Sequence, residues 1–135
     1  MSPRQQVQVF PFRLFGGRRE YLLLRRVPAV GGFWQPVTGG VEAGETPAEA
    51  AVREIGEETA LAGRLLETGL GSGFTWAGIR WQETVFAWQV DAGDPVIGPE
   101  HDDFTWCGLG EAWWRLYWPL NRRHLAAIDR QLAEL

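Results

Sequence analysis

The segment that decides the fold runs from Gly39 to Leu61 and reads Gly-Gly-Val-Glu-Ala-Gly-Glu-Thr-Pro-Ala-Glu-Ala-Ala-Val-Arg-Glu-Ile-Gly-Glu-Glu-Thr-Ala-Leu. Within it, Thr46-Pro47-Ala48-Glu49 is a capping box with proline at the first helical position, which predicts the start of a helix. The segment holds six acids and one base, so it carries −5 in a chain whose net charge is −4. Acidic blocks are usually solvated faces or tails, but tails lack the glycine and apolar residues interleaved here.

The predicted helix has a carboxylate side and an apolar side. At about 100° per residue, Glu54, Glu57 and Glu58 fall within one arc of about 100°. The apolar side, which we expect opposite this arc, consists of Ala48, Ala51, Val52 and Ile55. Like charges one turn apart cost a few tenths of a kcal/mol each, and Gly56 costs about 1 kcal/mol relative to alanine. The helix is therefore less stable than its length allows.

Two neighbouring features favour a metal site over a merely solvated carboxylate face, which is the alternative interpretation. Gly39-Gly40 lies just before the helix, where the backbone can approach a ligand closely. Arg53 lies one turn from Glu57 and can hold that carboxylate in place. Hard divalent cations such as Mg²⁺ prefer oxygen ligands and commonly share them with substrate phosphates. The segment therefore indicates a divalent-cation site.

Composition bounds the remaining possibilities. A chain of 135 residues with 45% hydrophobic and 22% charged residues is typical of one globular domain, which we expect to span residues 1–135. Cys107 is the only cysteine and cannot form an internal disulfide. No apolar run is long enough to cross a bilayer, and the first residues lack a signal-peptide core. These features predict a cytoplasmic protein with no membrane partner.

The other elements predict an α/β sandwich with a mixed sheet and two helices. We expect a strand over residues 7–12, which Pro11 should end or place at a sheet edge, and a hairpin from it through Gly16-Gly17 to residues 21–24. Residues 27–32 read as a loop. Further strands are expected from residue 65, over 79–90 and over 101–107, and an amphipathic helix over 122–135. Its buried stripe should contain Leu125, Ile128, Leu132 and Leu135.

At this point residues 39–61 resemble the Nudix box, which is a glycine, five residues, Glu, seven residues, and Arg-Glu-apolar-any-Glu-Glu-any-Gly-apolar. The matching positions are Gly39, Glu45, Arg53, Glu54, Ile55, Glu57, Glu58 and Leu61. The one departure is Ala60, which stands where the family has a helix-terminating glycine and so concerns the exit turn rather than the ligand set. The resemblance implies an α/β/α sandwich whose box forms a loop–helix–loop. It also implies a hydrolase of nucleoside diphosphates linked to a group X, dependent on Mg²⁺ or Mn²⁺.

The resemblance implies roles residue by residue. Glu54, Glu57 and Glu58 become the candidate metal ligands and general base, with Glu58 the surest ligand, and the Gly39 carbonyl a further ligand. Arg53 becomes the orienting residue, and Glu45 supports the loop. Family members often add a carboxylate from a segment shaped like Glu-His-(x)n-Trp, which residues 100–106 match. Glu100 is therefore a candidate outer ligand or general base, with an exposed loop acid as the alternative, while His101 suits a supporting role because magnesium prefers oxygen.

A narrower resemblance concerns the substrate. Residues 33–42 and 118–122 are similar to segments of dihydroneopterin triphosphate and deoxyadenosine triphosphate pyrophosphohydrolases, which implies substrate contacts for Arg25 and Thr38. Among the eight tryptophans, Trp34 and Trp76 are expected in loops, where they could stack on a base or pterin ring. Trp81, Trp88 and Trp106 are expected in the core, and Trp113 and Trp114 beneath the last helix. The chain has no lysine, so phosphate should be held by arginine, namely Arg25, Arg26 or Arg80.

The sequence thus predicts a metal-dependent pyrophosphohydrolase that converts a nucleoside triphosphate or a related compound to a monophosphate and pyrophosphate. Hydrolysis of dinucleoside polyphosphates, nucleotide sugars or capped RNA remains an alternative, because the box handles only the shared diphosphate. A further alternative is a non-catalytic domain that binds a nucleotide as a sensor, although such domains usually lose box glutamates. Outside the box the charge is nearly balanced, so no duplex nucleic acid is expected as a partner. A monomer or a homodimer is expected.

Overall fold

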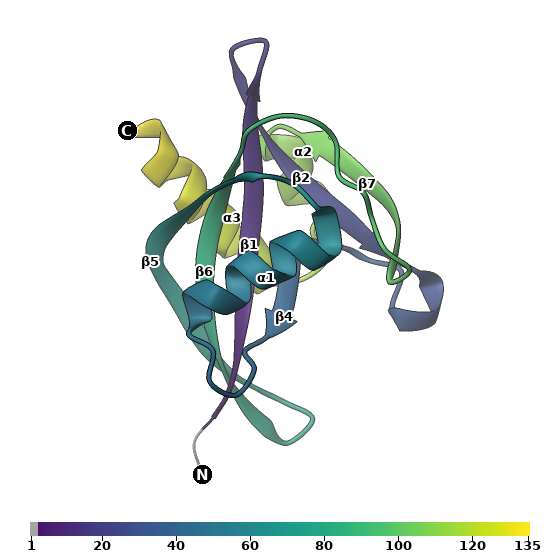
Figure 1. The fold of residues 1–135 in the computed structure, drawn as a ribbon, viewed down its shortest axis with the longest axis vertical. Coiled ribbons are helices and arrows are strands. Elements are labelled where there is room, and N and C mark those ends of the chain that lie inside the picture. The colour runs from purple at the N-terminus through teal and green to yellow at the C-terminus, as the bar shows by residue number, and fades with distance from the viewer. Residues whose placement is uncertain (1–2) are drawn as a thin grey trace.

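The computed structural model describes residues 3–135, within which seven strands form one mixed sheet flanked by three α-helices (Figure 1). The strands are β1 (Arg4–Phe15), β2 (Arg18–Arg26), β3 (Trp34–Gln35), β4 (Val37–Gly40), β5 (Gly63–Trp76), β6 (Ile79–Val90) and β7 (His101–Cys107). The helices are α1 (Pro47–Thr59), α2 (Leu109–Arg115) and α3 (Pro119–Ala133), with a 3-10 helix η1 (Pro28–Val30) inside the predicted loop.

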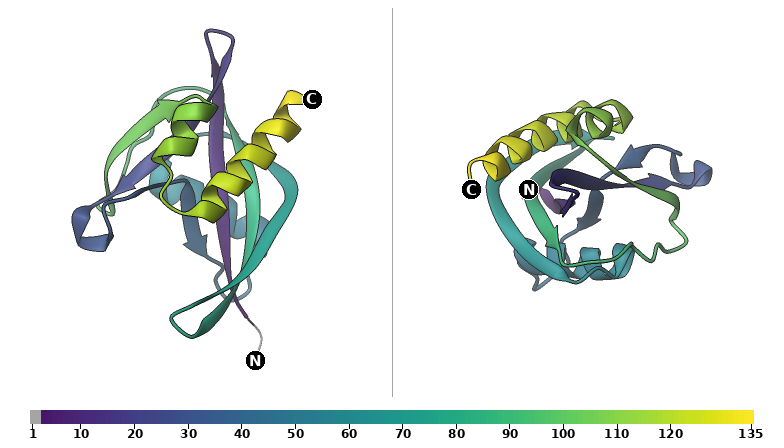
Figure 2. Two further views of the ribbon diagram at one scale, coloured as in Figure 1. Left: turned by 180° about the vertical axis from the view of Figure 1, so that it is seen from behind. Right: turned by 90° about the horizontal axis from the view of Figure 1, so that it is seen from above.

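The sheet lies between α1 on one face and α2 with α3 on the other, as the view from above shows (Figure 2). Alternate residues of the strands supply the two hydrophobic cores. Val7, Val9, Leu22 and Leu24 pack with Ala51 and Ile55 of α1, whereas Phe10, Phe12, Tyr21 and Leu23 pack with Leu125 and Ile128 of α3. This arrangement confirms the predicted α/β sandwich with a mixed sheet.

The central strand β1 changes its neighbour part-way along its length. Residues from Gln6 to Val9 pair with β4, whereas residues from Phe12 to Phe15 pair with β2. On its other side β1 pairs in parallel with β6 from Arg4 to Phe12. The prediction that Pro11 ends the strand or marks a sheet edge was wrong, because Pro11 lies inside β1 at the point where the partner changes. There the missing N–H of proline interrupts no continuous ladder on the β4/β2 side.

The strands predicted over 79–90 and 101–107 are confirmed, as are the β1–β2 hairpin and the capped start of α1. The last helix begins earlier than predicted, with Pro119 as its first residue, and Leu135 lies beyond its end and is exposed. The helix α2 was missed, because seven residues with two adjacent tryptophans show no clear helical period. Trp113 and Trp114 lie on α2 and are exposed, which corrects their predicted burial beneath α3.

Candidate active site

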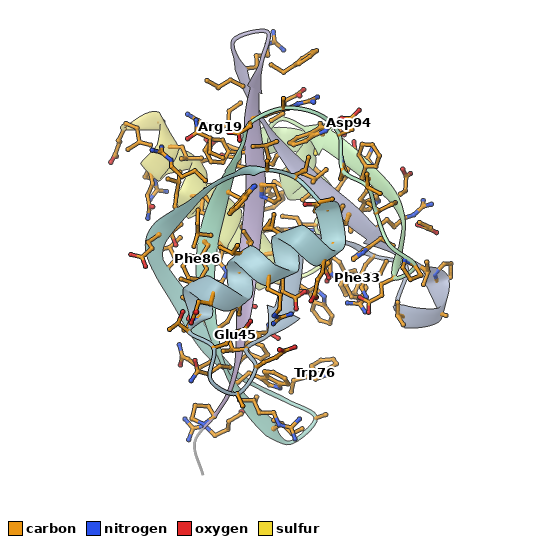
Figure 3. All side chains as sticks on the ribbon, viewed as in Figure 1. Arg19, Phe33, Glu45, Trp76, Phe86 and Asp94 are labelled. Carbon is orange, nitrogen blue, oxygen red and sulfur yellow. The ribbon has the colours of Figure 1, made fainter. Side chains whose placement is uncertain are left out.

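The loop before α1 is fixed to the helix by reciprocal hydrogen bonds. The Thr46 hydroxyl accepts a hydrogen bond from the Glu49 amide (3.1 Å), and the Glu49 carboxylate accepts one from the Thr46 amide (2.9 Å). Arg53 then binds both carboxylate oxygens of Glu45 through Nε (2.7 Å) and Nη2 (3.0 Å), and Nη2 also donates to the Gly40 carbonyl (2.9 Å). Glu45 lies in that loop beside the helix (Figure 3). The loop and helix are therefore one rigid unit.

Arg53 also orients the carboxylates of the helix. Its Nη1 donates to Glu54 Oε1 (2.7 Å) and to Glu57 Oε2 (3.3 Å). The hydrogen bond from Arg53 lowers the pKa of Glu45, and the same contacts raise the pKa of Arg53 itself. Arg53 does not line the cavity described below, but it contacts Glu54 and Glu57, which do.

We predicted that the three glutamates lie on the side of α1 opposite its apolar side. This is wrong for two of them. The buried side of α1 contains Ala50, Ala51, Ile55 and Thr59. Glu54 and Glu58 lie along that side, and the Glu54 side chain is only 12% exposed. Glu57, by contrast, has a side chain that is 59% exposed, and Val52, predicted on the apolar side, is exposed.

A cavity of about 400 Å³, which we call the acidic cavity, opens where Glu54, Glu57 and Glu58 meet the start of β7. Its other lining residues are Arg26, Thr38, Gly39, Gly98, Pro99, Glu100 and His101. A Cβ atom at Gly39 would lie 2.1 Å from the Glu54 carboxylate carbon, so any other residue there would displace that carboxylate from its present position. The three box glutamates and Glu100, separated by some 40 residues in the sequence, are thus brought together.

The carboxylates of the acidic cavity repel one another in a partly dry environment. Burial, followed by the charges of Glu54 and Glu100, raises the pKa of Glu58 to about 8, against an opposing effect of Arg26 and the Thr38 backbone. Burial also raises the pKa of Glu54, although the Arg53 hydrogen bond opposes the change. The pKa of His101 is lowered by burial and by the Arg26 charge, so its imidazole is neutral at pH 7. Extra positive charge here would stabilise the ionised glutamates.

A second cavity of about 590 Å³, the aromatic cavity, adjoins the first and shares Arg26 and Thr38 with it. Arg26 ends β2 and Thr38 lies in β4, the two strands that pair with β1 on either side of Pro11. Figure 1 shows β2 diverging from β1 beyond this point. The remaining residues lining the aromatic cavity are Gln6, Gln8, Phe33, Gln35, Phe74, Trp76, Trp81, Glu83, Trp118, Pro119, Leu120 and Asn121.

The aromatic side chains of this cavity touch one another. Trp118, just before α3, packs edge-on against Phe33 (5.6 Å between ring centroids) and against Trp76 (5.6 Å). Phe33 follows η1 and Trp76 ends β5, so three distant segments meet at one wall; Figure 3 labels Phe33 and Trp76. Trp76 is nevertheless 61% exposed, which leaves its ring accessible.

Most of the buried polar atoms that lack a protein partner belong to these two cavities. Within residues 3–135 there are six such side-chain atoms, and five of them are on residues that line the cavities. They are Arg26 Nε, Glu58 Oε2 and His101 Nε2 at the acidic cavity, and Gln35 Nε2 and Asn121 Oδ1 at the aromatic cavity. Because unpaired buried polar groups are costly, their concentration here indicates a place for a polar ligand.

The donor set of the acidic cavity fits a hard divalent cation. Its acidic members offer only oxygen atoms, and the buried Glu58 Oε2 has no partner. In the described part of the chain, no three acidic, imidazole or thiol groups already converge at metal-binding distance. The Glu54 carboxylate accepts a hydrogen bond from Arg53 instead of converging with the other acidic groups of the cavity.

A model of the NUDIX domain family matches residues 4–131. The chain belongs to the Nudix family. Among solved structures, a Caenorhabditis elegans Ap4A hydrolase in a binary complex superposes with a TM-score of 0.86 over 98% of this chain and 99% of that one, at 22% identity. The Escherichia coli dihydroneopterin triphosphate pyrophosphohydrolase superposes with a TM-score of 0.76 over 90% and 91% of the two chains, at 24% identity. At these identities the likeness concerns the fold.

One curated relative is similar in sequence. It is an octanoyltransferase of Myxococcus xanthus, 39% identical over 120 residues, which are 84% of this chain and 33% of that protein. The chain therefore spans about a third of the length of the curated relative it matches. Of the helices described, none is both long and apolar enough to cross a bilayer.

With the Nudix family established, the departure at Ala60 has a structural explanation. Ala60 follows α1 with φ 57° and ψ 22°, the left-handed conformation that favours glycine. Its amide still donates to the Ile55 and Gly56 carbonyls, so the helix ends where the family glycine would end it. Alanine in this conformation costs about 1–2 kcal/mol. The exit turn of the box is thus preserved at the expense of some strain.

Three of the predicted substrate contacts lie outside both cavities. Arg25 is paired with Asp102 (2.8 Å), and Trp34 packs toward the α3-side core with Arg25 and Arg115 over its ring. Arg80 lies just beyond the aromatic cavity, in a shallower hollow that also contains Trp81. Trp34 and Trp76 are both in strands, not in loops as predicted. Thr38 and Trp76, in contrast, do line the cavities.

Several cavity residues were not predicted as site residues. Trp81 was assigned to the core, and Phe33, Gln35, Glu83 and Trp118 were not considered as ligand contacts. Trp81 and Glu83 lie in no motif, and the narrower resemblance that covers Phe33, Gln35 and Trp118 gave them no role. The available signal for Phe33 was its adjacency to Trp34, because neighbouring side chains of an extended segment point to opposite sides.

Proposed function

We propose that this Nudix domain is a divalent-metal-dependent pyrophosphohydrolase that converts a nucleoside triphosphate, or a closely related triphosphate, to a monophosphate and pyrophosphate. Family membership and hydrolase neighbours of the same fold support an enzyme acting on phosphoric anhydride bonds. The observation that carries the finer proposal is the pair of cavities joined through Arg26 and Thr38. A triphosphate with a flat ring has two chemically different ends, and the two cavities match them.

The acidic cavity supports phosphate chemistry. Glu54, Glu57, Glu58 and the Gly39 carbonyl are the candidate metal ligands, and Glu100 is a candidate outer ligand. When bound, Mg²⁺ or Mn²⁺ would neutralise phosphate charge and lower the pKa of a bound water. Arg26, which lies between the two cavities and has an unpartnered Nε, is the residue best placed to bind phosphate oxygens directly.

The chain's own groups can also handle the proton released by the attacking water. Glu57 is the most exposed of the three box glutamates, and Glu100 approaches the cavity from another segment, so each is a candidate base. Arg53 holds Glu54 and Glu57 in fixed orientations while the Glu45 contact ties Arg53 to the loop. Such pre-organisation lowers the cost of reaching the transition state.

The aromatic cavity supports a substrate with a planar group X. Trp76, Trp118 and Phe33 provide rings on which a base can stack, and Thr38 and Arg26 lie between those rings and the glutamates. A dinucleoside polyphosphate is the second candidate. Because the Trp76 side chain is largely exposed, a second base could lie beyond the base that stacks in the cavity. The retained glutamates and the unpartnered Glu58 Oε2 favour catalysis over a sensor role.

The test is a substrate screen that separates pyrophosphate from orthophosphate release. The protein is incubated with nucleoside triphosphates, dinucleoside polyphosphates and nucleotide sugars, each with Mg²⁺ and with excess chelator. We expect stoichiometric pyrophosphate and monophosphate from a triphosphate, with no turnover in chelator. Absence of turnover on every triphosphate, or release of orthophosphate alone, would contradict the proposal.

A further inference from the structure

The sheet face toward α3 changes from apolar to polar along its length. Phe10 and Phe12 of β1 and Val85 of β6 belong to the α3-side core. The preceding residues of the same face are Gln8, Gln6 and Glu83, and Gln6 lies directly opposite Glu83 in the register. Two of these polar residues are buried, since Gln8 is only 1% exposed and Glu83 only 3%, and Gln6 is half-buried. They line the base of the aromatic cavity.

Hydrogen bonds to neighbouring side chains fix these polar groups in place. The Gln6 amide donates to Glu83 Oε2 (2.5 Å), which leaves the carboxylate with further acceptor sites. Gln8 Oε1 is 2.8 Å from His124 Nδ1, and His124 Nε2 is 3.0 Å from the Ser72 hydroxyl. The Ser72–His124–Gln8 chain therefore fixes the Gln8 amide. A buried carboxylate supported in this way is costly unless something in the cavity uses it.

Two more polar groups at this cavity lack partners. Gln35 Nε2 is a buried hydrogen-bond donor, and Asn121 Oδ1 is a buried acceptor; both side chains are on residues no more than 5% exposed. Gln35 ends β3 and Asn121 lies in the first turn of α3, so both are on rigid elements. The cavity thus offers one free donor, one free acceptor and a carboxylate, between aromatic rings.

We propose that the aromatic cavity reads the 2-amino-oxo-pyrimidine edge shared by guanine and pterin rings. The Gln35 amide would donate to the ring oxo group. The Glu83 carboxylate would accept from both the ring N–H and the 2-amino group, and the Asn121 carbonyl would accept the second hydrogen of the 2-amino group. In adenine an amino group replaces the oxo group, N1 carries no hydrogen and the 2-amino group is absent, so Gln35, Glu83 and Asn121 would all be left unpaired. This inference rests on the proposed function in one respect: it names the ring of the substrate that the proposed active site would bind.

The first test uses the wild-type protein and ligands that need no hydrolysis. Binding of guanosine, inosine and adenosine monophosphates and of a neopterin phosphate is measured by tryptophan fluorescence in chelator. We expect guanosine monophosphate to bind on the order of tenfold more tightly than inosine monophosphate, which lacks only the 2-amino group, and than adenosine monophosphate. Whichever of the guanine and pterin ligands binds more tightly identifies the ring that the natural substrate carries. Equal affinity for the three purines, or no binding by any ligand, would overturn the proposal.

The second test assigns the preference to a residue. Glu83→Gln replaces one acceptor by a donor at nearly constant volume, and its matched control is Glu67→Gln, an exposed glutamate of β5. We expect Glu83→Gln to abolish the guanosine-over-inosine preference and the control to retain it. If Glu83→Gln fails to fold, Asn121→Ser serves instead. Persistence of the preference in the folded variants contradicts the proposal. Ring preference without turnover would refute only the proposed hydrolysis, and turnover without ring preference would refute only this inference.

Discussion

The acidic and aromatic cavities share two residues but differ in how the sequence encodes them. The acidic cavity takes four of its residues from one 23-residue segment, Gly39 to Leu61, held rigid by Arg53 and the helix cap. The aromatic cavity collects residues from β1, β3, β5, β6 and α3, and no single segment supplies most of them. Under the proposed function, this difference places a rigid reaction centre next to a cavity wall whose residues can be substituted one at a time.

Loss of the Glu58 carboxylate should have the largest effect. Glu58→Gln removes the buried oxygen that lacks a partner, and with it a proposed metal ligand, so kcat should fall at least about a hundredfold on every substrate. The measurement is steady-state pyrophosphate release, with Glu67→Gln as the exposed control. An unchanged kcat would mean that the acidic cavity is not the reaction centre.

Loss of an aromatic ring should instead change KM. Trp76→Ala removes a stacking surface that is 61% exposed, so folding should be preserved. Stacking contributes about 1–3 kcal/mol per base, which predicts a KM rise of about tenfold with kcat within about twofold. The control is Trp114→Ala, on α2 and 76% exposed, which should change neither constant. A kcat loss as large as that of Glu58→Gln would erase the distinction between the cavities.

In the metal-free protein, the pH dependence of stability should reveal the buried Glu58 carboxyl of the acidic cavity. Because the pKa of Glu58 is raised to about 8, the protonated form is favoured in the folded state. Its stabilising contribution is complete below the unfolded pKa of about 4.3 and is lost as pH rises through 8. Glu58→Gln should therefore melt several degrees above wild type at pH 8 and level with it near pH 4.5. Mg²⁺ should close the gap at pH 8 by stabilising the wild type only; a gap that does not vary with pH would contradict this assignment.

The smallest effect is expected at the exit of α1, away from both cavities. Ala60→Gly relieves the left-handed strain of alanine, less the entropy that glycine adds to the unfolded chain, so it should stabilise by about 0.5–1 kcal/mol. Calorimetry should show a melting temperature a few degrees higher with unchanged kinetics. The control Ala62→Gly, at a residue without positive φ, should not stabilise. A lower melting temperature for Ala60→Gly than for the wild type would show that Ala60 is not strained.

The same contrast explains how much the sequence could predict. Residues 39–61 predicted the capped helix, its glutamates and the glycine loop because those signals are local. Two features there were missed: Glu54 and Glu58 flank the buried side of α1, and Val52 does not. Which side of a helix is buried depends on the sheet beneath it, which helical periodicity alone does not contain.

The aromatic cavity could not be predicted because it depends on tertiary placement. The alternation of Gln6, Val7, Gln8 and Val9 indicates a strand with one solvated face, yet Gln8 is buried. Only the placement of Trp118 and α3 over that face makes it a cavity wall. The same limit put Trp34 in the site instead of its neighbour Phe33, because only the three-dimensional placement of the segment shows which of the two side chains lines the cavity.

The most direct test of the two-cavity account is a crystal structure with Mg²⁺ and a triphosphate whose α–β bridge is a methylene group. The account predicts phosphates between Glu58 and Arg26, and the ring against Trp76 and Trp118. A ring placed on Trp34, or phosphates bound away from Glu54 and Glu58, would contradict it.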